Sequence, residues 1–279
     1  MYFLNINKPK HLTSFDVIKH LRKKLKITQI GHSGTLDPLA TGVVQVAVGK
    51  ATKLLDYLDS DKTYIADIKF GYVTKTYDSE EEEIFVKKPD FTLDELDDCL
   101  KTFIGKTMQI PPKYSAIKIN GEKLYDIARK NPDRKIYIQP REIEIYSLEL
   151  LNFENYTAKI KVCCKKGTYI RSLVYDIGQK LGCGAYMTDL ARIKSGNFDI
   201  ENANTLDDIE YTKLNPLNVI NIKKYELNDD EIKYIKNGNF IKNSSNLKNS
   251  LLLLAKNNKL VAIGNVEQNF IKPKKYFGE

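Results

Sequence analysis

The spacing of apolar residues predicts a chain of mixed strands and helices. The segment Thr63 to Gly71 alternates strictly between apolar and polar positions, which is typical of a strand with one buried face. Its apolar face holds Tyr64, Ala66, Ile68 and Phe70, and its other face is broken by Lys62, Asp67 and Lys69. Apolar runs predict further strands: Tyr2 to Ile6, Val43 to Val48, and the pair Ile136 to Leu151 and Tyr156 to Cys164.

Helices are expected where apolar residues recur every three or four positions and where capping residues precede them. Four segments meet these conditions: a helix capped by Thr13 or Ser14, Lys53 to Leu58, a helix opened by the capping box Thr92 to Glu95 and ending at Gly105, and a helix from about Tyr169 to Gly182. The first helix would bury Phe15, Ile18, Leu21 and Leu25, and the last Ile170, Leu173, Val174, Ile177 and Leu181.

The pattern of predicted elements changes near residue 222. Residues 214–224, LNPLNVINIKK, resemble a linker, and short strand signals follow at Leu251 to Leu254 and Leu260 to Ile263. We therefore expect a main domain over residues 1–222 and a small β-rich domain over residues 223–279. The fold class is α+β, with helices flanking the sheet of the main domain.

Composition is that of an ordinary globular protein, with 42% apolar and 29% charged residues among 279. No apolar run approaches the length that spans a bilayer, and the first ten residues lack the features of a signal peptide. We expect a cytoplasmic protein. Three histidines and four cysteines, without a CxxC, do not give zinc-ligand spacing. We expect no metal site, and interpret the thiols as buried or incidental: Cys99, Cys163, Cys164 and Cys183.

The net charge of +8 is concentrated in one segment. Residues 101–171 hold 15 Lys or Arg against 7 Asp or Glu, and the remaining charges cancel. Tyrosines are interleaved with these basic residues, which suits a phosphate backbone whose bases can stack. The alternative is a solvated basic face, which is common in lysine-rich proteins. Charge alone leaves both possibilities open.

The most informative stretch is a loop at residues 31–42, GHSGTLDPLATG, which is dense in Gly, Asp and Pro. Its turn-forming residues would hold Asp37 at a defined place just before a buried strand. Pro38 restricts Asp37 to extended backbone geometry. Taken alone, an Asp-Pro in such a loop is more often a turn residue that bonds its own backbone than a functional carboxylate.

The same stretch resembles the catalytic loop of the TruB family of tRNA pseudouridine synthases. Four other stretches resemble that family in the same order along the chain: NKPKHLTSFDVI from residue 7, KTYIADIKFG from residue 62, QIPPKYSAIKINGEKLYDIAR from residue 109 and KGTYIRSLVYDIGQKLGCGAYMTDLARI from residue 166. Together they cover most of residues 3–198. The resemblance implies a mixed sheet in the main domain and an RNA-binding, PUA-like domain at the C-terminus.

The resemblance also implies roles for six residues around one uridine. These are Asp37 as the catalytic aspartate, Tyr64 as the ring that stacks on the base, Arg171 as the partner of the carboxylate, His32 as an aid in turning the base outward, and Tyr169 and Leu190 as walls of the uridine pocket. Taken singly, each has a simpler explanation, such as a core tyrosine or a solvated arginine. As an ordered set with Asp37, they favour the functional interpretation.

The implied activity is isomerisation of uridine 55, in the T loop of tRNA, to pseudouridine. We expect base flipping, no cofactor, no membrane, no obligate protein partner and a monomer. A free aspartate has a pKa of about 3.9, so it is ionised at pH 7 as the chemistry needs. Whether Asp37 attacks the base, attacks C1′ or abstracts the 2′ proton stays open.

Two other functions remain possible on the sequence. An RNA chaperone would bind and fold tRNA without needing Asp37. An aspartate-dependent nucleoside hydrolase would need a second carboxylate for acid–base work, and residues 31–42 contain no acidic residue besides Asp37.

Overall fold

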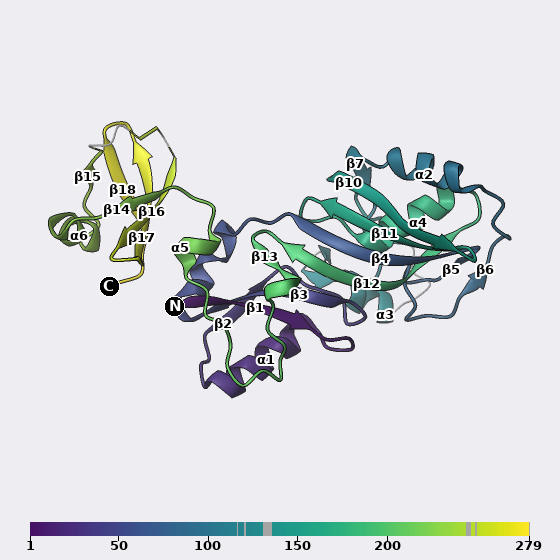
Figure 1. The fold of residues 1–279 in the computed structure, drawn as a ribbon, viewed down its shortest axis with the longest axis horizontal. Coiled ribbons are helices and arrows are strands. Elements are labelled where there is room, and N and C mark those ends of the chain that lie inside the picture. The colour runs from purple at the N-terminus through teal and green to yellow at the C-terminus, as the bar shows by residue number, and fades with distance from the viewer. Residues whose placement is uncertain (116, 120, 131–135, 244–246, 249, 279) are drawn as a thin grey trace.

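The structure, a computed structural model, describes residues 1–115, 117–119, 121–130, 136–243, 247–248 and 250–278. Two β-sheets lie side by side along the long axis of the molecule (Figure 1). The larger sheet is built from residues before 200, and the smaller one from residues after 223. Both chain ends lie near the junction of the two sheets, where Met1 and Gly278 line one groove (Figure 1).

The larger sheet is mixed, as expected. Within the described residues its main path runs β1-β3-β12-β4-β11-β10-β7, with β2 on β3 and β13 on β12. Every pair is antiparallel except β3 with β12, which is parallel. The strands are β1 (Tyr2–Lys8), β2 (Ile30–Ser33), β3 (Thr41–Val48), β4 (Lys62–Phe70), β7 (Gly105–Gln109), β10 (Arg141–Glu154), β11 (Thr157–Cys164), β12 (Ala185–Ser195) and β13 (Phe198–Asp199). Short hairpins add β5 (Tyr72–Val73) with β6 (Ile84–Phe85) and β8 (Lys118–Ile119) with β9 (Glu122–Lys123).

Strand β4 confirms the predicted alternation but not the predicted position of Lys62. Tyr64, Ala66, Ile68 and Phe70 are buried on one face. Lys62 is two residues from Tyr64 and lies on the same buried face, with 9% exposure. The prediction of Lys62 on the opposite face was wrong, because side chains alternate with a period of two regardless of their polarity.

The helices flank the large sheet, and their caps agree with the sequence. They are α1 (Ser14–Leu25), α2 (Leu93–Lys101), α3 (Leu124–Lys130) and α4 (Ile170–Lys180), with 3-10 turns η1 (Gly49–Tyr57) and η2 (Ile200–Asn202). Thr13 and Thr92 each form a complete capping box. α1 buries Val17, Ile18 and Leu21 against the sheet.

One predicted core position and several predicted boundaries were wrong. Phe15 is 52% exposed on α1 rather than buried. The expected helix at residues 53–58 is the 3-10 segment η1. α2 ends at Lys101, because the Thr102 hydroxyl donates to the Cys99 carbonyl and Gly105 opens β7. The strand predicted to start at Ile136 starts instead at Arg141, as β10, because Pro140 has no N–H to pair.

The C-terminal β-rich region forms its own sheet, in the order β14-β16-β17-β18-β15. Its elements are β14 (Lys224–Glu226), α6 (Asp229–Lys236), β15 (Ile241–Lys242), β16 (Leu251–Lys256), β17 (Lys259–Glu267) and β18 (Phe270–Tyr276). The expected linker is instead packed: α5 (Pro216–Val219) buries Leu217 and Val219 in a cluster that joins Phe3 to Ile263. This cluster fixes the second sheet against the first. The division at residue 222 and the PUA-like character stay predictions.

Among the described residues, no helix is long and apolar enough to cross a membrane.

Candidate active site

Asp37 lies on a short, heavily anchored loop. The loop covers residues 34–40, because residues 31–33 belong to β2 and residues 41–42 to β3. The Leu36 amide donates to the Ser14 hydroxyl at 2.9 Å, and the His11 amide donates to the Pro38 carbonyl at 2.8 Å. Lys8, which is 0% exposed, donates to the same carbonyl at 3.3 Å. These bonds hold the backbone on both sides of Asp37.

Both ends of the loop are fixed from β12. Arg192 is completely buried, and its Nε donates to the Val43 carbonyl at 2.7 Å while its Nη2 donates to the Gly34 carbonyl at 3.2 Å. Gly42 lies directly against β12, with φ of 107°, and a Cβ there would stand 2.2 Å from the Arg192 carbonyl oxygen. Only glycine fits this close approach. The loop therefore enters β3 along one defined path.

Arg171 comes to Asp37 from the first turn of α4. Its Nε lies 2.9 Å from Asp37 Oδ2, and its side chain is only 6% exposed. The start of α4 is fixed by Gln109, whose side chain accepts from the Tyr169 amide at 2.8 Å and donates to the Tyr169 carbonyl at 3.0 Å. The simpler alternative, a solvated arginine, does not hold for Arg171, because its side chain is buried. The expected pairing with Asp37 is present.

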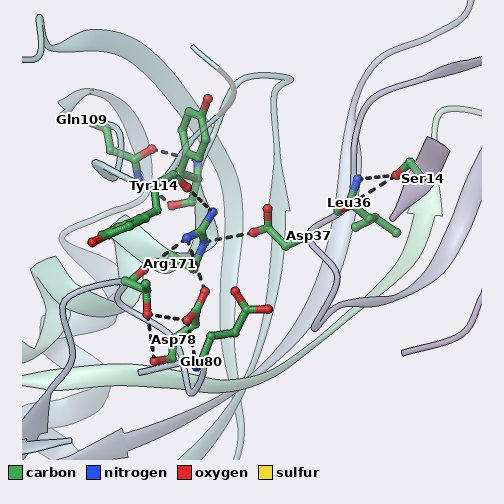
Figure 2. Close-up of polar contacts among 10 residues, drawn as sticks. Ser14, Leu36, Asp37, Asp78, Glu80, Gln109, Tyr114 and Arg171 are labelled. Carbon is green, nitrogen blue, oxygen red and sulfur yellow. Dashed lines mark hydrogen bonds and ion pairs between the residues drawn. The ribbon is translucent and has the colours of Figure 1, made fainter. Parts of the chain in front are cut away.

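A second carboxylate shares the guanidinium. Arg171 Nη1 lies 3.3 Å from Asp78 Oδ2 and 3.2 Å from the Thr76 carbonyl, and Nη2 donates to the Tyr114 carbonyl at 3.0 Å. Figure 2 shows the guanidinium between Asp37 and Asp78. Asp78 is 1% exposed and accepts from the Thr76 hydroxyl at 2.6 Å and the Glu80 amide at 3.1 Å. Arg171 is thus held through Nη1 and Nη2 by Asp78, Thr76 and Tyr114, while its Nε faces Asp37.

A cavity of about 530 Å³ opens beside this pair. Five of the six predicted site residues line it: Asp37, Tyr64, Tyr169, Arg171 and Leu190. Tyr64 and Leu190 are mostly buried, at 7% and 6% exposure, on the neighbouring strands β4 and β12. Asp37, with its side chain 37% exposed, remains open to a ligand. The cavity thus presents an ionisable carboxylate beside an aromatic wall.

His32 is placed differently from the other five. It lies on β2 and is missing from the described residues that line the cavity. Burial, and next the charge of Arg192, lower the pKa of His32 below its ordinary value. Both effects favour the neutral imidazole. Its role in turning the base outward stays a prediction.

Four charged residues of the site were missed from the sequence: Lys62, Asp78, Glu80 and Arg192. Glu80 begins a run of four glutamates, residues 80–83, and Asp78 precedes it by two positions; the sequence indicates only an acidic loop here. Figure 2 places Glu80 beside Asp78 near the carboxylate of Asp37, and burial, followed by the charges of Asp78 and Asp37, raises the pKa of Glu80. Strict alternation from Tyr64 would have placed Lys62 in the cavity wall, where the structure has it. Further carboxylates thus stand near Asp37, although residues 31–42 hold none.

The described residues contain no group of three or more His, Cys, Asp or Glu that could hold a metal ion. All four cysteines are free thiols, and Cys99, Cys164 and Cys183 are buried.

Solved structures share the whole fold. A structure of an H/ACA ribonucleoprotein bound to a substrate RNA containing 2′-deoxyuridine matches with a TM-score of 0.75 and 23% identity, over 100% of this chain and 85% of that chain. A Cbf5–Nop10–Gar1 complex matches with a TM-score of 0.74 and 24% identity, over 99% and 84%. At such identities the likeness concerns the fold alone.

The sequence comparisons define the class as pseudouridylate synthase. Residues 22–170 match the model of the TruB family pseudouridylate synthase N-terminal domain, and residues 171–216 match that of the tRNA pseudouridylate synthase B C-terminal domain. A tRNA pseudouridine synthase B of Fusobacterium nucleatum is 44% identical over 98% of both chains. One from Clostridium novyi is 45% identical over 82% of this chain and 76% of that protein. The chain belongs to the TruB family.

Proposed function

We propose that this chain isomerises uridine 55, in the T loop of tRNA, to pseudouridine, with Asp37 as its catalytic carboxylate and without a cofactor. The observation that carries the proposal is the Asp37–Arg171 pair at 2.9 Å on the wall of a cavity large enough for a nucleoside. The reaction breaks the C1′–N1 bond and forms a C1′–C5 bond. C5 loses a proton and N1 gains one, so atoms and electrons balance without an oxidant or water.

The target uridine must leave its stack to enter the cavity. Extrusion costs a few kcal/mol, and stacking on an aromatic ring returns about 1–3 kcal/mol per base. Tyr64 is the ring proposed to supply this, with Tyr169 and Leu190 as the other walls. His32, whose lowered pKa favours the neutral imidazole, would fill the vacated place in the RNA without carrying a charge.

The RNA is held outside the cavity by its phosphates. Arg141 and Lys166 are exposed, line the cavity and belong to the basic segment 101–171. Cations in such positions attract a phosphate backbone without reading its sequence. We propose that the enzyme is cytoplasmic and acts on the T arm as a monomer, without a protein partner. A single peak of monomer mass in light scattering would support the monomer.

The test uses an unmodified tRNA transcript and its variant with cytidine at position 55. Pseudouridine is mapped after incubation with the wild-type protein and with Asp37→Asn, which is nearly isosteric. We expect modification at position 55 only, its loss in Asp37→Asn, and little change in RNA affinity. Binding without modification by the wild-type protein would identify an RNA chaperone, and release of free uracil would identify a hydrolase.

A further inference from the structure

Lys62 is a cation inside the cavity with no role in the chemistry proposed above. It lies on β4 two residues from Tyr64, and both side chains face the cavity. Successive residues on one face of a strand are about 7 Å apart. The extended side chain of a lysine spans most of that distance, so its ammonium group can approach a base stacked on Tyr64.

Lys62 forms no ion pair with a carboxylate among the described residues. Its Nζ donates to the Ser60 carbonyl at 2.6 Å, and its side chain is 9% exposed. Arg192, a second fully buried cation, lies close by: a Cβ built on Gly34 would stand 3.2 Å from Lys62 Cε and 3.5 Å from Arg192 Nη1. Burial, and next the charge of Arg192, lower the pKa of Lys62 to about 8. The charge of Asp61 acts in the opposite direction but is the smaller effect. Two cations without a carboxylate in direct contact therefore meet beneath the Asp37 loop.

The other side of the site is already paired. Arg171 contacts both Asp37 and Asp78, so neither carboxylate is left to neutralise Lys62. A buried charge without a counter-ion is unfavourable for folding. A site that retains one is prepared for negative charge that arrives with the substrate or develops during the reaction.

Uridine isomerisation develops such a charge on the base. If Asp37 attacks C1′ or takes the 2′ proton, the electron pair of the C1′–N1 bond passes to N1 and spreads over O2 and O4. If Asp37 adds to C6, the electrons of the C5–C6 double bond pass to C5 and O4. In each route these electrons later form the C1′–C5 bond.

We propose that Lys62 is a further catalytic residue of the reaction, whose ammonium group stabilises the negative charge that develops on the uracil ring. Arg192 acts with it as a positioning residue, because it holds Gly34 over the Lys62 side chain. The proposal rests on the pseudouridine synthase activity proposed above.

The alternative ligand is a backbone phosphate. Phosphates stay hydrated, and the exposed Arg141 and Lys166 at the cavity are better placed for them. Lys62 lies in the buried wall on the same face of β4 as Tyr64, the residue on which the base is proposed to stack. The observations therefore favour the base over the phosphate.

The test compares single-turnover rate constants at saturating enzyme and pH 7 for wild type, Lys62→Met and Lys62→Arg. The matched control is Lys69→Met on the same strand, since Lys69 pairs with Glu83 away from the cavity. We expect Lys62→Met to lose about 100-fold in rate, the magnitude typical of removing one group that stabilises a developing charge. Lys62→Arg should recover part of the loss, and Lys69→Met should keep the wild-type rate.

A base that carries negative charge more easily distinguishes a catalytic role of Lys62 from a role in folding. Fluorine withdraws electrons, so 5-fluorouracil carries negative charge more easily than uracil. With 5-fluorouridine at position 55, the rate defect of Lys62→Met should shrink at least several-fold, measured as loss of 5-fluorouridine after digestion. The variant should melt at or above the wild-type temperature, because it removes an unpaired buried charge.

Each other result overturns the proposal. Equal defects on both RNAs, or a lower melting temperature with no dependence on the leaving group, would make Lys62 structural. If Lys62→Met keeps the rate constant but binds RNA more weakly, with an affinity that depends less on salt concentration, Lys62 is a phosphate contact. Failure of the wild type to form any pseudouridine would instead refute the function proposed above, and is measured separately.

Discussion

Removing Arg171 should damage stability and activity through different partners. In Arg171→Met, Asp78 stays 1% exposed without its guanidinium. Breaking a buried ion pair by deleting one partner costs about 3–5 kcal/mol. Asp78 keeps two donors, the Thr76 hydroxyl at 2.6 Å and the Glu80 amide at 3.1 Å, so the lower end, about 3 kcal/mol, is expected. Asp37, with its side chain 37% exposed, adds little because water reaches it.

The assay is thermal and urea unfolding combined with single-turnover kinetics. For a chain of this size about 3 kcal/mol lowers the melting temperature by roughly 6 °C. The double variant Arg171→Met, Asp78→Asn replaces the unpaired carboxylate with a neutral amide that still accepts both bonds. It should recover at least half of the lost stability and none of the activity, because Asp37 still lacks its partner.

The conservative variant Arg171→Lys isolates the geometry. An ammonium keeps the charge but cannot reach Asp37, Asp78 and the Tyr114 carbonyl together. Losing hydrogen bonds to charged groups costs about 1.5–3 kcal/mol, or roughly 10- to 150-fold in rate. Wild-type turnover in Arg171→Lys, or recovered activity in the double variant, would refute this account of the pair.

Two further predictions concern the cavity wall. Tyr64→Phe should keep stacking and much of the RNA binding, whereas Tyr64→Ala should lose about 1–3 kcal/mol of binding in filter assays; equal losses would implicate the hydroxyl. The second concerns Lys62, whose pKa is lowered to about 8 and which faces Arg192, Cys164, Asp61 and Lys166. Above pH 8 the folded chain loses a proton that the unfolded chain keeps up to about pH 10. Between pH 7.5 and 9.5 the free energy of unfolding of the wild type should therefore rise by about 1–2 kcal/mol relative to that of Lys62→Met, measured by urea unfolding. A difference that does not change with pH would contradict the burial of a charged lysine without an ion-pair partner.

Local patterns predicted the elements that depend on neighbours in the chain. The alternation in β4 and the capping boxes at Thr13 and Thr92 appear in the structure as expected, because each is set by residues within a few positions. The rigid loop around Asp37 was also expected, from the density of Gly, Asp and Pro in residues 31–42 and from Pro38. The anchors of that loop were not, since Lys8, Ser14 and Arg192 reach it from other elements.

The sequence by itself determined some of the strands and helices, among them β4, α1 and α4, but not β12. It also determined the turn that carries Asp37 and, through its resemblance to a family, a pairing of Asp37 with Arg171. Only the tertiary structure decided which charges are buried and what they face. Asp78, Lys62 and Arg192 differ little in sequence from solvated charges, and packing of β12, α4 and the Asp37 loop encloses them. Burial is a property of the assembled elements, so one-dimensional spacing cannot assign it. It is burial that gives these charges their electrostatic effect, because water no longer screens them.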